Sequence, residues 1–194
     1  MGFLPQMRNI MNHIPSERQT MCFSATLDKT VAHLVREYLK NPLHIAIGSI
    51  LKPADSVALR IYEVIREQKL PLLMHLLQIE TGTFLVFTRT KYGADKLFRK
   101  LTERKIDVGV LHGGKSQSQR TRALEGFKGG KHRVLVAPDI AARGIHVKGI
   151  AHVINYDMPQ AAEDFIHRVG RTGRVKDQGI ATTFVMPEEA RDIQ

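Results

Sequence analysis

The sequence predicts an α/β fold in which a parallel sheet lies between two layers of helices. From residue 57 onward, short apolar segments alternate with segments in which apolar residues recur every three or four positions. This alternation is typical of the strands and crossover helices that build a parallel sheet. Hydrophobic residues make up 43% of the 194 residues, which is enough to cover both faces of such a sheet.

Each element follows from its local pattern. Six apolar segments predict strands, at residues 59–65, 83–87, 107–111, 133–137, 152–155 and 181–185. Five segments between them predict helices, at residues 69–79, 91–104, 117–127, 139–142 and 161–169. Together these elements predict one α/β domain over residues 58–194.

The N-terminal residues predict a smaller piece with a different organisation. Helical periodicity and the prolines that follow it predict helices at 1–14 and 28–39, and apolar runs predict short strands at 19–23 and 43–47. We expect residues 1–48 to be the remnant of another domain, and residues 49–57 to be a linker.

The chain is basic and has a single cysteine. Lys and Arg number 29 against 19 Asp and Glu, a formal charge of +10. This charge favours an anionic partner, nucleic acid ahead of a membrane surface, with a basic protein that has no such partner as the alternative. Cys22, between two apolar residues, is expected to be a buried structural thiol. No apolar run approaches a membrane span and no signal-peptide pattern is present, so we expect a cytoplasmic protein.

Residues 167–174, His-Arg-Val-Gly-Arg-Thr-Gly-Arg, contain three arginines, one histidine and two glycines. One interpretation is a solvated basic turn, because a packed core would need a partner for each guanidinium. The other is a polyphosphate clamp at the rim of the sheet. Arg171 and Arg174 are three residues apart and can converge on one anion, and Gly170 and Gly173 let the backbone approach it.

Polar residues follow the predicted strands at their carboxyl ends, where ligands bind in parallel sheets. These residues are Thr88-Arg89-Thr90, His112-Gly113-Gly114, Pro138-Asp139 and Asn155-Tyr156-Asp157. Their basic, hydroxyl and glycine content predicts a rim that contacts phosphates.

Residues 109–116 satisfy the pattern G-x-x-x-x-G-K-S of a phosphate-binding P-loop. The apolar residues Val110 and Leu111 continue the preceding strand, so only residues 112–114 are left for a turn. This turn is too short to wrap a phosphate, and we therefore reject a P-loop here.

Several segments resemble, in order and spacing, the motifs of the C-terminal RecA-like half of a DEAD-box RNA helicase, similar to the bacterial RhlE-type branch. They are Ser24-Ala25-Thr26 (motif III), Leu85–Thr90 (motif IV), His112-Gly113 with Gln117–Arg120 (motif IVa), Val134–Val147 (motif V) and His167–Arg174 (motif VI). The resemblance implies a three-layer, RecA-like (P-loop NTPase-like) helicase C-terminal domain. It also makes residues 1–48 a remnant of the N-terminal RecA-like domain.

In this family two RecA-like domains close on ATP with Mg²⁺ and on single-stranded RNA. The resemblance implies that Arg171 and Arg174 reach the ATP phosphates and act with His167 in catalysis. It assigns ATP binding also to Gly144 and His146, and coupling between the sites to Ser24, Ala25 and Thr26. The implied RNA-binding residues are Arg89, Thr90, Gly113, Gln117, Arg120 and Pro138. For Gln117 and Arg120, ordinary solvation of a helix start is the alternative.

Two residues depart from the family pattern. Pro138 stands where the family has threonine, and it offers an RNA phosphate neither a hydroxyl nor an N–H. His146 stands where the family has an aspartate that would accept hydrogen bonds from the ATP ribose. We expect poorer nucleotide affinity than in a member that has the aspartate.

The sequence contains no accepted P-loop and no Asp-Glu-Ala-Asp motif, so we expect the Mg²⁺ ligands on a missing N-terminal domain and no ATPase activity from the isolated chain. Three functions remain open. The chain is the C-terminal portion of an ATP-dependent RNA helicase, a stand-alone RNA-binding or helicase-modulating module, or half of a DNA-directed helicase.

Overall fold

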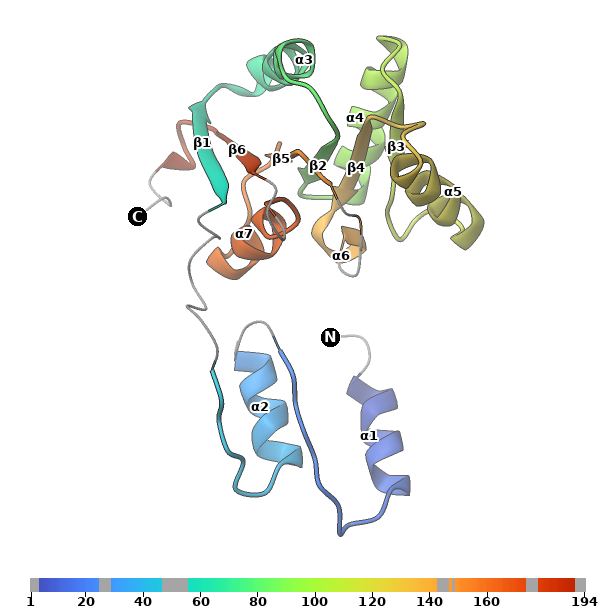
Figure 1. Ribbon diagram of the computed structural model, residues 1–194, viewed down its shortest axis with the longest axis vertical. Helices are drawn as coiled ribbons and strands as arrows, with labels where there is room; N and C mark the ends of the chain where they lie inside the picture. The colour runs from blue at the N-terminus through green and yellow to red at the C-terminus, as the bar shows by residue number, and fades with distance from the viewer. Residues whose placement is uncertain are drawn as a thin grey trace. The chain divides into compact units, whose positions relative to one another are not determined.

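The computed structural model describes residues 4–24, 29–46, 56–142, 147, 149–173 and 178–190. The chain divides into two units, Met1–Ile50 and Leu51–Gln194 (Figure 1), which we describe separately. The predicted linker at 49–57 stays a prediction, because most of it lies outside the described residues.

In the described part of the first unit there are two helices, α1 (Leu4–His13) and α2 (Lys29–Tyr38), close to the predicted spans. Arg8 Nε lies 3.4 Å from Glu37 Oε1, which links the two helices. Helix α1 has no buried residue. The apolar residues of this unit therefore do not form a core of their own among the described residues.

The two strands predicted in this unit are wrong. Residues 19–24 and 41–46 have no strand structure, and their apolar side chains are exposed, including Phe23 (87%) and Leu43 (86%). A strand needs a neighbour to pair its backbone N–H and C=O groups, and the described residues of this unit offer none. Cys22 is exposed as well, so the expected buried thiol is wrong for the same reason.

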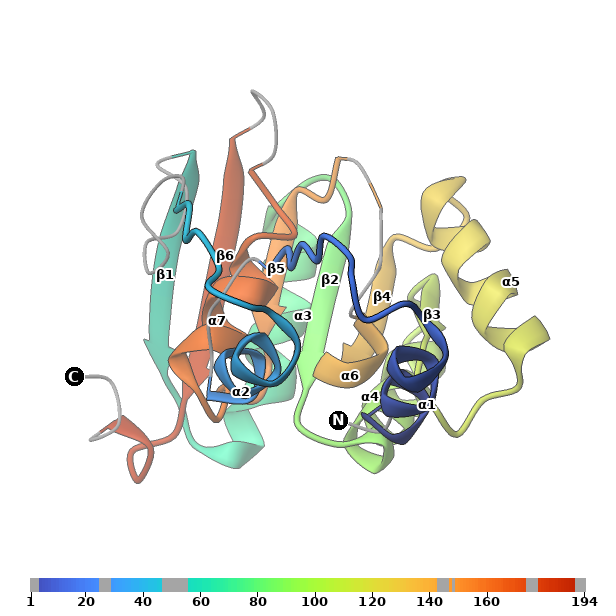
Figure 2. The ribbon, with the colours of Figure 1, turned by 90° about the horizontal axis from the view of Figure 1, so that it is seen from below.

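The second unit contains the predicted parallel sheet. In its described residues the strands are β1 (Val57–Glu63), β2 (Phe84–Thr88), β3 (Val108–Val110), β4 (Val134–Pro138), β5 (His152–Asn155) and β6 (Gly179–Val185). Figure 2 shows their order, β1-β6-β5-β2-β4-β3, and every neighbouring pair is parallel. The predicted fold class is confirmed.

Helices cover both faces of this sheet (Figure 1). They are the short 3₁₀ turn η1 (Arg66–Gln68) and α3 (Lys69–Ile79), α4 (Lys91–Glu103), α5 (Gln117–Lys128), α6 (Asp139–Ala142) and α7 (Ala162–Val169). Leucines of α3 and α4 pack with Phe84 and Val86 on one face, while α5, α6 and α7 pack with Leu85 and Phe87 on the other. Alternating side chains of β2 therefore supply two cores.

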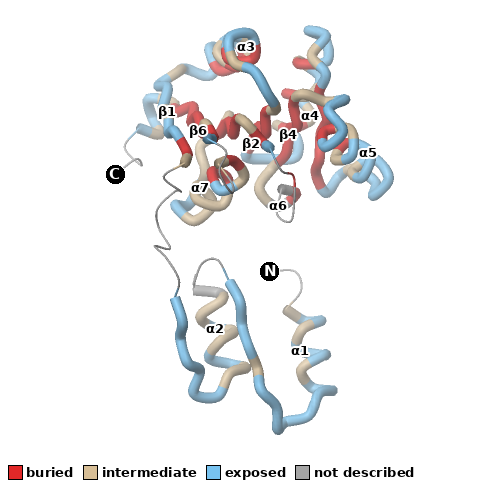
Figure 3. The backbone as a smooth tube through the Cα atoms, viewed as in Figure 1, coloured by how far each residue is buried: buried red, intermediate tan, exposed pale blue. Residues whose placement is uncertain are grey.

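The central strands are buried on both faces (Figure 3), which explains why Phe84–Phe87 is continuously apolar rather than alternating. Helices α4 and α5 begin directly after residues whose side chains cap them. The Thr90 hydroxyl accepts the Gly93 N–H at the start of α4, and Ser116 with Gln119 forms a capping box at the start of α5. No helix in the described ranges is long and apolar enough to cross a membrane.

Candidate functional site

The carboxyl ends of β2, β4 and β5 meet at one edge of the sheet, because these strands are neighbours. Thr88 pairs in register with Pro138, and Phe87 with Asn155. The topology therefore brings together three of the predicted loops, 88–90, 138–139 and 155–157. We call this edge the rim.

A buried arginine ties the rim together. Arg168, on α7, is 2% exposed, and its Nε and Nη2 donate to the two carboxylate oxygens of Asp139 at 2.5 and 2.7 Å. Its Nη1 donates to Asn155 Oδ1 at 3.2 Å and to the Asp157 carbonyl at 2.7 Å. The guanidinium lies 5.1 Å from the centre of the Phe87 ring. All three nitrogens are thus used inside the domain.

Arg168 and Asp139 are rim residues whose partnership was not predicted, and the interpretation of residues 167–174 as a solvated turn is wrong for Arg168. A signal was available. Phe165 and Val169 pack in the core between the sheet and helices α5, α6 and α7. Arg168 lies three residues after Phe165 and beside Val169, so its position is on the helix face turned to the sheet.

The loop after β2 carries Arg89 and Thr90. Its backbone is fixed by the Arg89 N–H, which donates to Asp157 Oδ2 at 2.9 Å, and by the Thr88 hydroxyl, which donates to the Thr90 carbonyl at 3.2 Å. The Arg89 guanidinium pairs with Glu189 at 2.6 Å.

The second basic loop of the domain follows β3. His112 is buried, and its Nδ1 accepts the Gly114 N–H at 3.1 Å. Its Nε2 lies 3.1 Å from Asp95 Oδ1, although the ring N–H is not aligned for a hydrogen bond. Lys115 Nζ lies 2.8 Å from the same oxygen. Burial raises the pKa of Asp95, but the interactions with Lys115 and His112 outweigh it and lower this pKa overall.

These contacts explain why residues 109–116 do not form a P-loop. Strand β3 runs to Val110, and the Leu111 N–H continues the pairing by donating to the Val136 carbonyl. The N–H groups of Gly114 and Lys115 both donate back to His112, so they are not directed at a phosphate. Lys115 itself is held by Asp95.

Gly113 and the start of α5 are open to a ligand. A Cβ at Gly113 would meet no atom within 4 Å, so the fold does not require glycine there. Gln117 is exposed, and its Oε1 accepts from Arg120 Nη1 at 3.2 Å. The Arg120 Nε is buried and has no hydrogen-bond partner.

Thr172 and Gly173 of the basic octet lie at the opposite edge of the sheet, so the expectation that the octet lies at the rim is wrong for these two residues, although Arg168 contacts the rim. Just beyond α7, the Thr172 hydroxyl donates to the carbonyl of Ile150, before β5. Gly173 has φ +66°, and a Cβ there would overlap the Val57 side chain at the start of β1. Gly173 therefore serves packing at the amino ends of the strands.

His167, on α7, and Arg171, two residues after the end of α7, are half-buried. Of the other predicted residues, Ser24 is described and exposed. Ala25, Thr26, Gly144, His146 and Arg174 lie outside the described residues. In the described ranges, no group of three His, Cys, Asp or Glu side chains is placed to hold a metal ion.

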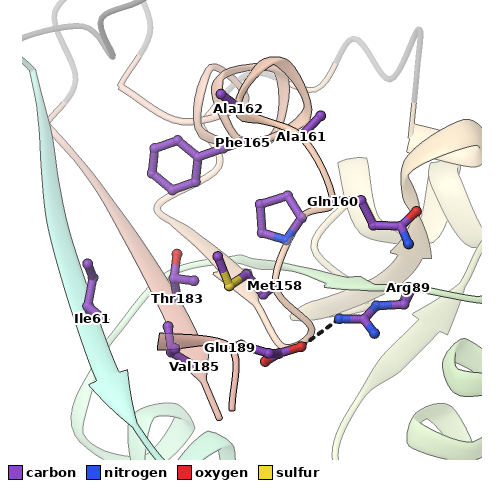
Figure 4. A pocket seen from close by; sticks show the side chains of 11 residues that line it. Ile61, Arg89, Met158, Gln160, Ala161, Ala162, Phe165, Thr183, Val185 and Glu189 are labelled. Atoms are coloured by element: carbon purple, nitrogen blue, oxygen red, sulfur yellow. Dashed lines mark hydrogen bonds and ion pairs between the residues drawn. The ribbon is translucent and has the colours of Figure 1, made fainter. Parts of the chain in front are cut away.

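A groove of about 920 Å³ opens beside the rim (Figure 4). Its walls are mainly apolar and come from β1, β6, α7 and the segment that leads into α7, including Ile61, Met158 and Phe165. The Arg89–Glu189 ion pair lies at one end. The sequence pattern gave no indication of this groove.

The family described as helicase conserved C-terminal domain matches residues 68–176. ATP-dependent RNA helicase vasa of Drosophila melanogaster is 43% identical over 195 residues, which cover 100% of this chain and 30% of that protein. ATP-dependent RNA helicase DBP2 of Lodderomyces elongisporus is also 43% identical, with 98% of this chain and 36% of that protein covered. The chain thus spans about a third of the length of these relatives.

Among solved structures, S. cerevisiae Dbp5 bound to RNA and ADP BeF3 is similar to the chain with a TM-score of 0.88. The sequence identity is 28%, and the match covers 100% of this chain and 51% of that chain.

Proposed function

Since the chain belongs to the DEAD-box family of RNA helicases and carries its helicase conserved C-terminal domain, we propose that it is the portion of an ATP-dependent RNA helicase that contributes arginines to ATP hydrolysis and half of the RNA-binding groove. The observation that carries the proposal is that two groups of basic residues lie toward opposite ends of the strands. The Arg89 loop lies at the carboxyl ends, and Arg171 directly precedes Thr172, which contacts the Ile150 carbonyl at the amino ends.

We assign RNA to the carboxyl-end surface. Its members are Arg89, Thr90, Gly113, Gln117, Arg120 and Pro138. Gly113 leaves its backbone accessible, and the exposed α5 start presents backbone N–H groups with a positive helix-dipole end, which suits a phosphate. Such contacts read the backbone and not the bases, so binding is sequence-tolerant and weakens steeply with salt.

We assign ATP to the other surface. The proposed set is Arg171 and His167, completed by Arg174, Gly144 and His146, which lie outside the described residues, and the guanidinium groups of the arginines fit a polyphosphate. When ATP is bound with Mg²⁺, the nucleotide supplies the phosphoryl group that is cleaved. The role of this chain is to orient the phosphates and stabilise the charge that develops on them. The Mg²⁺ ligands are assigned to an N-terminal RecA-like domain, in cis or in trans, with Ser24, Ala25 and Thr26 coupling the sites.

The test is reconstitution. We expect the 194-residue chain alone to show negligible ATP hydrolysis, and a mixture with an N-terminal RecA-like domain that carries the P-loop and DEAD motifs to hydrolyse ATP when single-stranded RNA is added. Arg171→Ala should then lower the turnover by roughly a thousandfold, as expected for an arginine finger. The matched control is Arg99→Ala, which removes an exposed arginine of α4 and should leave turnover unchanged.

A second candidate function is a stand-alone RNA-binding or helicase-modulating module, which the charge of +10 favours. RNA binding without any rescue of ATP hydrolysis would support it over the first proposal. Comparing single-stranded RNA and DNA of one sequence tests a DNA-directed half, since equal or tighter DNA binding would contradict both RNA proposals.

The two departures from the family pattern have separate tests. Pro138 ends β4 and pairs in register with Thr88, and Pro138→Thr should tighten RNA binding because it restores a hydroxyl and an N–H at the rim. His146→Asp should tighten ATP binding by roughly tenfold in the reconstituted complex, since a charged acceptor is gained. Unchanged ATP affinity would remove His146 from the proposed set.

A further inference from the structure

Asp157 follows β5 and contacts three other segments of the domain. Its Oδ1 lies 3.4 Å from Lys69 Nζ, and its Oδ2 accepts the Arg89 N–H at 2.9 Å. Its carbonyl accepts from Arg168 Nη1 at 2.7 Å, while its own N–H donates to the Phe87 carbonyl at 3.3 Å. Four interactions therefore hold Asp157 in place, two through its carboxylate and two through its backbone.

Lys69 explains why the carboxylate is held in one orientation. Its side chain is 4% exposed, and its Nζ lies 5.8 Å from the centre of the Tyr156 ring. A buried ammonium is costly unless it is paired, and Asp157 is its ion-pair partner. Burial, with the nearby Asp157 charge, raises the pKa of Tyr156 to about 12, so the ring stays neutral.

The carboxylate faces the loop after β2. A Cβ placed on Gly93 would lie 4.0 Å from Asp157 Oδ2 and 3.3 Å from the Thr90 hydroxyl. The Thr90 hydroxyl in turn accepts the Gly93 N–H at 3.0 Å. One carboxylate oxygen is thus engaged by Lys69, and the other sets the position of the Arg89 backbone.

We propose that Asp157, held by Lys69, is a positioning residue for RNA binding that keeps the Arg89–Thr90 loop in the shape that meets RNA phosphates. The proposal rests on the RNA-binding function proposed above. It requires no contact between Asp157 and RNA, since the carboxylate acts through the Arg89 amide. Because Arg168 binds the Asp157 carbonyl, the same residue also joins this loop to α7.

The charge of Asp157 makes the proposal testable. Asp157→Ala removes one negative charge and so raises the net charge of the chain by one, and on electrostatic grounds alone this would tighten RNA binding. We expect the opposite, a roughly tenfold weaker affinity for a short fluorescently labelled oligouridylate, because the phosphate-binding loop is displaced. Glu80→Ala is the matched control. It makes the same charge change and breaks an ion pair with Arg60 (2.6 Å) at the amino end of β2, and it should not weaken RNA binding.

Two double variants cover the case in which an unpaired Lys69 prevents folding. Lys69→Met with Asp157→Ala removes both charges of the ion pair and the acceptor for the Arg89 amide. Lys69→Met with Asp157→Asn removes both charges but keeps an acceptor oxygen. We expect the Asn pair to bind oligouridylate within about threefold of the native chain and the Ala pair roughly tenfold more weakly.

An amide NMR spectrum adds a readout that does not depend on RNA. The Arg89 amide proton should shift upfield in the Ala pair and stay near its native position in the Asn pair. Equal RNA affinities of the two pairs, or an unchanged Arg89 signal in the Ala pair, would overturn the positioning role alone. A native chain that binds no single-stranded RNA would instead overturn the proposed function.

Discussion

Arg168 and Asp139 form a two-point ion pair inside the domain, although 29 residues separate them, with Nε–Oδ1 and Nη2–Oδ2 distances of 2.5 and 2.7 Å. Arg168→Ala should destabilise the domain by about 3 kcal/mol, because it leaves a carboxylate and a buried amide without their donor. Arg168→Lys should recover little of this loss, since an ammonium cannot reproduce a two-point fork. Urea unfolding measures both, and a Lys variant as stable as the native chain would contradict the geometry.

Gly113→Ala separates ligand binding from folding. The added methyl group meets no protein atom within 4 Å, so the free energy of unfolding should change by less than about 0.5 kcal/mol. The same methyl group occupies the open face where we place an RNA phosphate, so RNA affinity should fall by roughly tenfold. Anisotropy titration measures the RNA affinity, and urea unfolding measures the stability. Undiminished RNA binding would exclude a close approach of an RNA phosphate to Gly113.

Gly173→Ala should behave in the opposite way. Gly173 has φ +66°, and its new methyl group would overlap Val57, so we expect a loss of about 2 kcal/mol or more. Gly130→Ala is the matched control, since Gly130 has φ +75° but open space around it. Its loss should be about 1 kcal/mol, from backbone strain alone. Equal losses in urea unfolding would show that packing against β1 contributes nothing.

The stability of the domain should fall in mild acid because of His152. Burial lowers the pKa of His152 below its usual 6.5, although the Thr81 carbonyl raises it. The unfolded chain therefore takes up this proton at a higher pH than the folded one. The stabilisation is present above about pH 6.5 and is lost progressively as the pH falls below it.

Melting temperatures measured from roughly pH 7 to 5 check this prediction. His152→Gln should flatten the slope, although it also loses the stacking of the ring on Phe84 at 4.3 Å. His75→Gln, which replaces an exposed histidine on α3, should not flatten it. An identical slope in the native chain and His152→Gln would assign the acid sensitivity to other groups.

Most of the second unit was predictable because its signals are local. The spans of α3 and α6 match the predicted residues, as does β5, since the apolar residues that indicate each element lie within its own segment. The strands predicted at 19–23 and 43–47 failed for a physical reason. A local apolar run predicts burial, but a strand also needs a partner edge, which sequence alone does not provide.

The sequence predicted which residues lie at the rim, but it did not predict which side chains they contact. Asp139, Asn155 and Asp157 were expected at the rim because each follows a buried strand. Their joint contact with Arg168 depends on how α7 crosses the sheet, and Lys69 reaches Asp157 across 88 residues. Such pairings are set by tertiary geometry, and no spacing in the sequence encodes them.

Two hydrogen bonds near the end of helix α7 reach opposite edges of the sheet, because Arg168 donates to the Asp157 carbonyl and Thr172, three residues beyond the helix, donates to the Ile150 carbonyl. With its eight residues, helix α7 is about 12 Å long. A tilt of about 10° moves one end by about 2 Å relative to the other, given this length. Arg168 and Thr172 are four residues apart, so a tilt of this size would strain hydrogen bonds at both edges of the sheet at once.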